Sequence, residues 1–292
     1  MILAVRAVLA VLTGVFAIIA GRDLAKNKNE FSDVGWGKLL GTGFITDFFD
    51  TLGIGSFSPT IAIWKFGNMI DDRLIPGSLN VGHTIPVVFE ALLFIGAIEV
   101  DPLTLVLMLG SATIGATLAA GVVAKLPTRQ VKLVMGIALL AVVVIMLAGQ
   151  LNLMPVGGEA TGLTGIKLVI GVVGNFILGA LMTVGIGLYA PAMALVYALG
   201  MSARVAFPIM MGSCAFLMPA AGMRFVKEGA YDRKASLALT LGGVVGVVIA
   251  FYIVKELPLN ILTWLVMAVI AYTGITMLRE VAKDKKTKKV EA

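Results

Sequence analysis

The sequence predicts an all-α protein that crosses a membrane as one bundle of helices, residues 1–292, built from two repeats of opposite orientation. Hydrophobic residues make up 59% of its 292 residues and charged residues only 14%, which is too apolar for a soluble domain. Apolar stretches of about 20 residues, the length of a helix that spans a bilayer, recur along the chain. A Gly-Ile-Gly motif followed by proline occurs twice, 132 residues apart, and each copy interrupts an apolar stretch.

The composition also excludes several classes of protein. The net charge of +6 is concentrated at the ends of the predicted helices and in the basic tail 280–292. Basic residues in these places are typical of the cytoplasmic flank of a membrane protein, so we expect no nucleic-acid partner. Cys214 is the single cysteine, which excludes a disulfide within the chain, and no Cys/His cluster suggests a metal. We therefore expect neither a metal nor a cofactor.

The first 20 residues are apolar except for Arg6 and predict an extra helix, 1–22, ahead of the repeats. A cleaved signal peptide is the alternative. The stretch is long, lacks a basic start and has no A-x-A site, so we expect a retained helix with its N-terminus outside.

The two repeats are predicted at 36–149 and 165–279. Four residues besides the glycines recur at an offset of 131: Asp101, Gly115, Pro127 and Met146 match Asp232, Gly246, Pro258 and Met277. Each copy has five apolar segments, at about 36–52, 56–66, 76–98, 103–124 and 131–149, and at about 166–184, 188–199, 203–225, 235–254 and 259–278. The first two segments of each copy are too short for separate spans, so we expect a helical hairpin bent at Gly-Ile-Gly.

Loop charges predict that the repeats are inverted. The loop between the third and fourth segments is acidic in the first copy and basic in the second, and the next loop is strongly basic only in the first. The basic residues concerned are Lys227, Arg233 and Lys234, and Lys125, Arg129 and Lys132. Since basic loops stay in the cytoplasm, equivalent loops lie on opposite sides and the C-terminal tail is cytoplasmic. Inverted repeats with broken helices indicate alternating access.

Two stretches carry a resemblance to a known family: Gly53-Ile-Gly55-Ser-Phe-Ser-Pro59 and Gly185-Ile-Gly187-Leu-Tyr-Ala-Pro191. The third segments add Gly82-His83-Thr84 and Gly212-Ser213-Cys214. In this order the motifs resemble the TauE/SafE family of sulfite and organosulfonate exporters, over about 36–279. The resemblance implies an inner-membrane permease that exports a small sulfur-containing anion such as sulfite, sulfoacetate or a related organosulfonate.

The helix breaks predict an anion site. A helix that starts at Ser56 or Leu188 near the bilayer centre presents unpaired N–H groups and the positive end of its dipole. The alternative is that the glycines only let the helices pack closely. The residues expected to bind substrate are Gly53, Ile54, Gly55, Ser56, Ser58, Gly185, Gly187 and Tyr189, with Asn80, His83, Thr84 and Ser213 of the third segments.

Three carboxylates, Asp47, Asp50 and Glu90, fall inside the predicted spans. A carboxylate near the bilayer centre costs about 3 kcal/mol or more, which favours a functional role. We expect these residues to carry a coupling proton, because ionised carboxylates would repel an anionic substrate. The alternative is that the two aspartates lie at a watery end of the hairpin or pair with Lys38 or Lys65.

The chain has no P-loop motif, which predicts a secondary transporter rather than an ATP-driven pump. A passive anion channel and an ion-coupled transporter of another small anion, thiosulfate or a carboxylate, stay open as alternatives. We expect no enzymatic activity, because Asp47 and Asp50 lie on one helix and no nucleophile motif stands out. The expected partners are a small anion, the lipid bilayer and, in a homodimer, a second copy of the chain.

Overall fold

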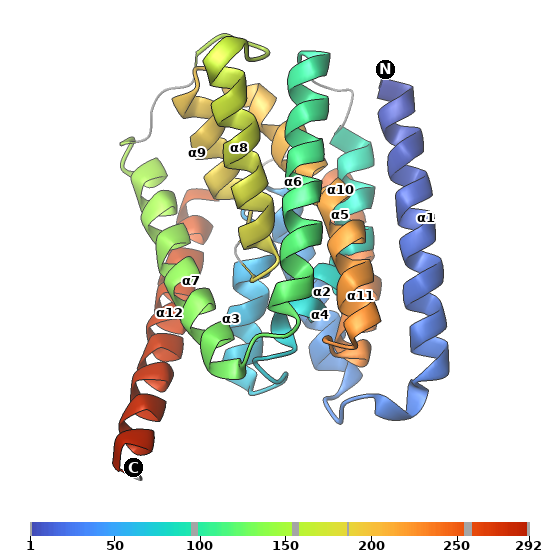
Figure 1. Ribbon diagram of the computed structural model, residues 1–292, viewed down its shortest axis with the longest axis vertical. Coiled ribbons are helices and arrows are strands. Elements are labelled where there is room, and N and C mark those ends of the chain that lie inside the picture. The colour runs from blue at the N-terminus through green and yellow to red at the C-terminus, as the bar shows by residue number, and fades with distance from the viewer. Residues whose placement is uncertain (1, 95–98, 154–157, 186, 254–258, 291–292) are drawn as a thin grey trace.

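The computed structural model describes residues 2–94, 99–153, 158–185, 187–253 and 259–290, and within these ranges it is a bundle of helices (Figure 1). The helices are α1 (Ile2–Lys26), α2 (Trp36–Thr51), α3 (Phe57–Gly67), α4 (Ile75–Gly82), α5 (Thr84–Phe94), α6 (Pro102–Val123), α7 (Thr128–Gln150), α8 (Gly165–Met182), α9 (Tyr189–Ala198), α10 (Ala203–Glu228), α11 (Arg233–Ile253) and α12 (Leu259–Val290), with a 3₁₀ turn η1 (Lys28–Glu30). Six of the described helices, α1, α6, α7, α8, α10 and α11, are long and apolar enough to cross a membrane. The prediction of an all-α bundle is confirmed.

Two helical hairpins are present, α2 with α3 and α8 with α9. With 18 residues α8 is long and apolar enough to cross a membrane by itself, so the expectation that the first segment of the second copy is too short for a span is wrong. In the first, α2 and α3 are separated by Gly53 and Gly55, whose φ angles of 89° and 91° lie where side chains other than glycine are strained. In the second, Gly185 has a φ of 103° and follows α8. The two hairpins enter the bundle from opposite ends and turn back near its middle (Figure 1).

The third segment of the first copy differs from its predicted form. One helix was expected over 76–98, but α4 and α5 are separated by a turn at His83, and 95–98 lie outside the described residues. Pro86 explains the break, because proline has no N–H to donate to the carbonyl of Gly82 four residues earlier. That carbonyl accepts a hydrogen bond from the Thr240 hydroxyl on α11 instead, at 2.7 Å.

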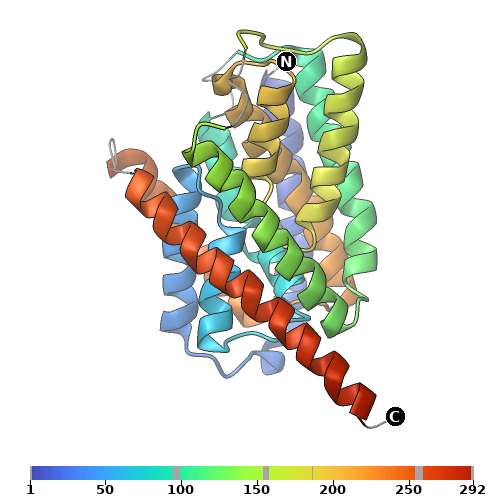
Figure 2. The same ribbon diagram turned by 90° about the vertical axis from the view of Figure 1, so that its left-hand side faces the viewer.

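Neighbouring helices approach closely at glycines. The most extensive helix–helix contacts are between α2 and α11, between α6 and α8, between α6 and α10, and between α7 and α12. A Cβ on Gly43 of α2 would stand 2.7 Å from the backbone of Leu239 on α11, so a larger residue would separate the pair. On one side of the bundle α12 runs alongside α7 (Figure 2).

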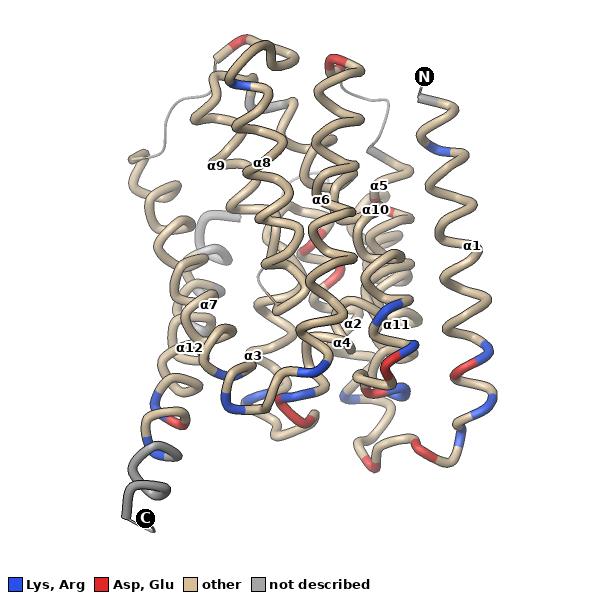
Figure 3. The backbone as a smooth tube through the Cα atoms, viewed as in Figure 1, with Lys and Arg blue, Asp and Glu red and all other residues tan. Residues whose placement is uncertain are grey.

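Most Lys and Arg residues gather at the end of the bundle where the C-terminus lies (Figure 3). At this end an ion-pair network joins α3, α7 and α12. Lys65 and Lys132 each contact both Asp72 and Glu280, at nitrogen–oxygen distances between 2.9 and 3.3 Å.

Candidate functional site

The two hairpin breaks meet at a small pocket of about 10 Å³. The first hairpin contributes Asp50, Gly55, Ser56 and Phe57, and the second contributes Met182, Gly187, Leu188 and Tyr189. Val87 of α5 and Cys214 of α10 complete the lining. In this conformation the pocket has room for about one water molecule.

Two helices begin at the pocket. Phe57 is the first residue of α3 and Tyr189 is the first residue of α9, so the first N–H groups of both helices, which have no partner within their own helix, lie at the same region. The N–H and hydroxyl of Ser56, just before α3, already contact the Asp50 carboxyl. Ser58 does not line the pocket, but its hydroxyl oxygen lies 3.8 Å from the place that a Cβ would take on Gly187. The Ser58 hydroxyl is buried and, among the described residues, has no hydrogen-bond partner. The arrangement offers donors from both hairpins to an acceptor between them.

A cluster of acidic and phenolic groups lies beside these helix ends. Asp50 lines the pocket and lies next to both Ser56 and Glu90. One carboxyl oxygen of Glu90, Oε1, accepts a hydrogen bond from the Tyr189 hydroxyl at 3.3 Å. Its other oxygen, Oε2, accepts no hydrogen bond in the part of the chain that the structure describes, but the Asp50 carboxyl lies close enough to share a hydrogen bond with Glu90 when one of the two is protonated. Glu90 is fully buried. A buried acceptor next to a second carboxyl group suits a site that takes up a proton.

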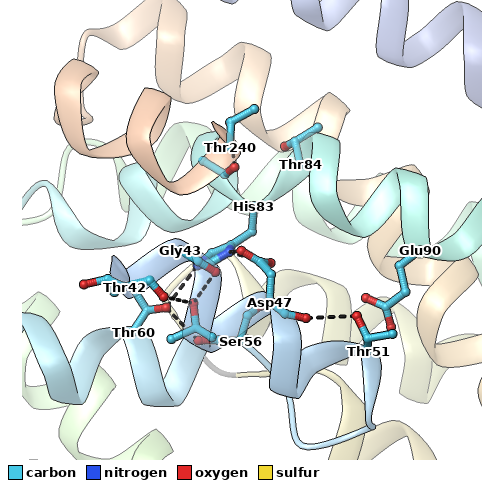
Figure 4. Close-up of polar contacts among 12 residues, drawn as sticks. Thr42, Gly43, Asp47, Thr51, Ser56, Thr60, His83, Thr84, Glu90 and Thr240 are labelled. Carbon is cyan, nitrogen blue, oxygen red and sulfur yellow. Dashed lines mark hydrogen bonds and ion pairs between the residues drawn. The ribbon is translucent and has the colours of Figure 1, made fainter. Parts of the chain in front are cut away.

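His83 lies between Asp47 and Thr60 (Figure 4). Its Nδ1 is 2.9 Å from both carboxylate oxygens of Asp47, and its Nε2 is 3.1 Å from the Thr60 hydroxyl. The Thr60 hydroxyl also donates to the carbonyl of Ser56 at 2.8 Å. This chain of contacts connects the turn at His83 to the first residues of α3 and therefore supports the hairpin break.

The structure disagrees with the alternative roles considered for the aspartates. Asp47 is fully buried and Asp50 is 2% exposed, so neither side chain lies at a watery end of the hairpin. Lys65 pairs with Asp72 and Glu280 rather than with either aspartate, and Lys38 is exposed.

Some residues expected at the site lie outside the pocket lining. The Asn80 amide donates to the carbonyl of Pro76, and the Thr84 hydroxyl donates to the carbonyl of Asn80, so both stabilise the break between α4 and α5. Ser213 accepts a hydrogen bond from the Asn175 amide on α8 at 2.8 Å. Gly53, Ile54 and Gly185 shape the breaks without lining the pocket.

Several pocket residues carried no signal in the sequence. Cys214 lines the pocket, with its sulfur 3.6 Å from that of Met182. Because α10 is apolar on nearly all sides, the sequence did not reveal whether Ser213 or Cys214 faces the breaks. Phe57, Val87 and Leu188 are ordinary apolar residues whose position depends on how the hairpins meet.

The described residues contain no group of three or more His, Cys, Asp or Glu side chains that could hold a metal ion. Comparisons of the chain with protein-family models, with curated proteins and with solved structures give no match.

Proposed function

We propose that the protein is a secondary transporter that moves a small oxyanion across the membrane by alternating access. The observation that carries the proposal is the meeting of two Gly-broken hairpins, from opposite ends of the bundle, at one closed pocket. Broken helices near the midplane, with their N-termini aimed at the ligand, are the usual binding site of transporters built from inverted repeats.

The pairing of the helices supports two inverted repeats, 36–149 and 165–279. The first segment of each copy packs on the fourth segment of the other, as α2 does on α11 and α8 does on α6. Likewise α3 contacts α12, and α9 contacts α7. A two-fold axis in the membrane plane would produce these exchanges, and it would relate the hairpins through the pocket.

The distribution of basic residues supports a cytoplasmic C-terminus and an N-terminus on the outside of the membrane. Basic residues gather at the end where the C-terminus lies, while the N-terminus lies at the other end (Figure 3). By the positive-inside rule the basic end is cytoplasmic. Cysteines placed singly at Asn152 and Lys286, in a Cys214→Ser background, should react with a membrane-impermeant reagent from opposite sides. Labelling from the same side would contradict the orientation.

The donors at the pocket favour an anion. The N–H groups at the starts of α3 and α9, with the Ser56 and Ser58 hydroxyls, could bind oxygens of a sulfite- or sulfonate-type group without any cationic side chain. The substrate class, a small sulfur-containing anion, follows from the sequence resemblance to sulfite and organosulfonate exporters. Because the closed pocket holds only about one water molecule, substrate entry requires the hairpins to separate.

The buried carboxyl groups support coupling to protons. Asp50 lines the pocket and Glu90 lies beside it, so two ionised carboxylates would repel an anion bound at the helix ends. Protonation removes this repulsion. A proton and an anionic substrate therefore favour the binding of each other, and by linkage the effect is reciprocal.

The decisive experiment is uptake of radiolabelled sulfite into proteoliposomes, with and without a pH gradient, competed by sulfonates, thiosulfate and sulfate. Saturable uptake that responds to the gradient and shows counterflow supports the transporter. Flux without saturation or counterflow would indicate a passive anion channel instead. No flux for any sulfur anion by a folded protein would exclude this substrate class.

A pair of variants tests whether Asp50 carries the coupling proton. Asp50→Asn should remove the effect of pH on the flux, while Asp33→Asn, which neutralises an exposed aspartate, should leave it unchanged. An unchanged pH profile in Asp50→Asn would refute the role of Asp50.

A further inference from the structure

A second cavity lies far from the hairpin breaks, between α1 and α10, with a volume of about 520 Å³. The α1 residues that line it, Ile19, Arg22, Asp23 and Lys26, have helical spacing and therefore share one face of the helix. Arg224 and Lys227, in the last turns of α10, form the opposite wall. The cavity is thus at the end of both helices, where the basic residues of the chain gather.

Four cationic side chains line this groove, Arg22, Lys26, Arg224 and Lys227, and all four are exposed. Within the described residues, none of them lies within ion-pair distance of a carboxylate. The groove therefore carries a positive charge that no carboxylate among the described residues neutralises through an ion pair.

The one carboxylate in the lining is already bound elsewhere. Asp23 accepts hydrogen bonds from the Tyr231 hydroxyl at 2.6 Å and from Nε of Arg233 at 2.8 Å. Its other oxygen accepts from the Asn27 amide at 2.9 Å. These contacts hold α1 against the turn between α10 and α11 and draw the carboxylate away from the four cations.

The floor of the groove is apolar. Ile19 lies one turn deeper in α1 than the cations, and Met223 and Val226 alternate with the basic residues on α10. A ligand that fits must therefore present an anionic group at the helix ends and a hydrocarbon portion along the helices. A free anion satisfies the first requirement only.

We propose that the groove between α1 and α10 binds the headgroup of an anionic phospholipid. Its phosphate lies among Arg22, Lys26, Arg224 and Lys227, and the start of an acyl chain lies along Ile19 and Met223. Basic pockets between transmembrane helices at the cytoplasmic surface are suited to such headgroups. The bound lipid would hold the extra helix α1 on the rest of the bundle, since α1 contacts mainly α10.

The test uses the full chain, purified and delipidated in a neutral detergent. Phosphatidylglycerol should raise the midpoint of thermal unfolding in a saturable manner, and phosphatidylcholine with the same acyl chains should have little effect. Arg22→Gln/Arg224→Gln should weaken the apparent affinity for phosphatidylglycerol about tenfold or more, because each cation near the surface contributes to binding.

The matched control is Arg73→Gln/Arg129→Gln, which removes the same charge from exposed arginines outside the groove. The control should bind phosphatidylglycerol as the wild type does. Equal binding by both double variants, or equal loss in both, would overturn the proposal. Stabilisation by inorganic phosphate at the same concentration as phosphatidylglycerol would also overturn it, because the site would then take a free anion.

Discussion

Both carboxylate oxygens of Asp47 lie 2.9 Å from Nδ1 of His83, and neither side chain has any exposed surface. The contact joins α2 to the turn between α4 and α5, next to the first hairpin break. Thr60 extends it into α3 by a contact with Nε2 of His83 at 3.1 Å. One buried pair therefore connects three helices that surround the break.

The Asp47–His83 pair predicts a strong energetic coupling. Asp47→Asn or His83→Gln alone should destabilise the protein by about 1–3 kcal/mol, because each disrupts a hydrogen bond between two fully buried polar groups. The double variant should lose less than the sum of the single losses. Thermal unfolding of the four proteins in detergent gives the cycle, and strictly additive losses would show that the pair is not coupled.

A substitution at Gly243 on α11 should also disturb the contact between Asp47 and His83. A Cβ at this position would collide with the carboxylate of Asp47 and with the ring of Pro86, so Gly243→Ala must displace Asp47. We expect a loss of about 1–3 kcal/mol, the usual effect of overpacking a core.

The control for Gly243 is Gly110 on α6, an exposed helical glycine whose added Cβ would meet nothing within 4 Å. Gly110→Ala should be neutral or slightly stabilising, because alanine favours a helix. Equal unfolding midpoints for the two variants would mean that Asp47 can move without loss.

The sequence predicted the apolar bundle, the two helix breaks and the buried acids, because each has a local signal in the order of residues. Glycines with positive φ at 53, 55 and 185 follow from the motifs themselves. The contact between Asp47 and His83 could not be predicted, since the residues are 36 positions apart and meet only after α2 packs on α11. The break at His83 had a signal in Pro86 that the apolar pattern of the segment concealed.

The ionisation of Asp101 should make the stability of the folded protein depend on pH in the acidic range. It caps α6, and the backbone N–H and hydroxyl of Thr104 donate to its carboxylate, which lowers the pKa of Asp101 below its ordinary value of 3.8. The folded state therefore favours the ionised form. Its stabilising contribution is present above pH 3.8 and is lost as the pH falls through the lowered pKa.

Asp101→Ala tests the cap. Its unfolding midpoint should lie below that of the wild type at neutral pH, and the two should converge as the solution becomes more acidic than the pKa of Asp101. Glu159→Ala, which removes an exposed carboxylate from the loop before α8, should follow the wild type. A constant difference between Asp101→Ala and the wild type at every pH would show that the charge of Asp101 does not matter.

Substitution of Gly55 tests whether the break between α2 and α3 takes part in transport. Its φ of 91° would strain any other residue by about 1–2 kcal/mol, and its Cα borders the pocket. Nothing lies within 4 Å of an added Cβ, so Gly55→Leu should remain folded while its side chain fills the space between the two hairpins. We therefore expect a small drop in the unfolding midpoint and an almost complete loss of flux in proteoliposomes. Gly14→Leu, a change on an exposed face of α1, should keep both properties, whereas full flux in Gly55→Leu would remove the break from the transport path.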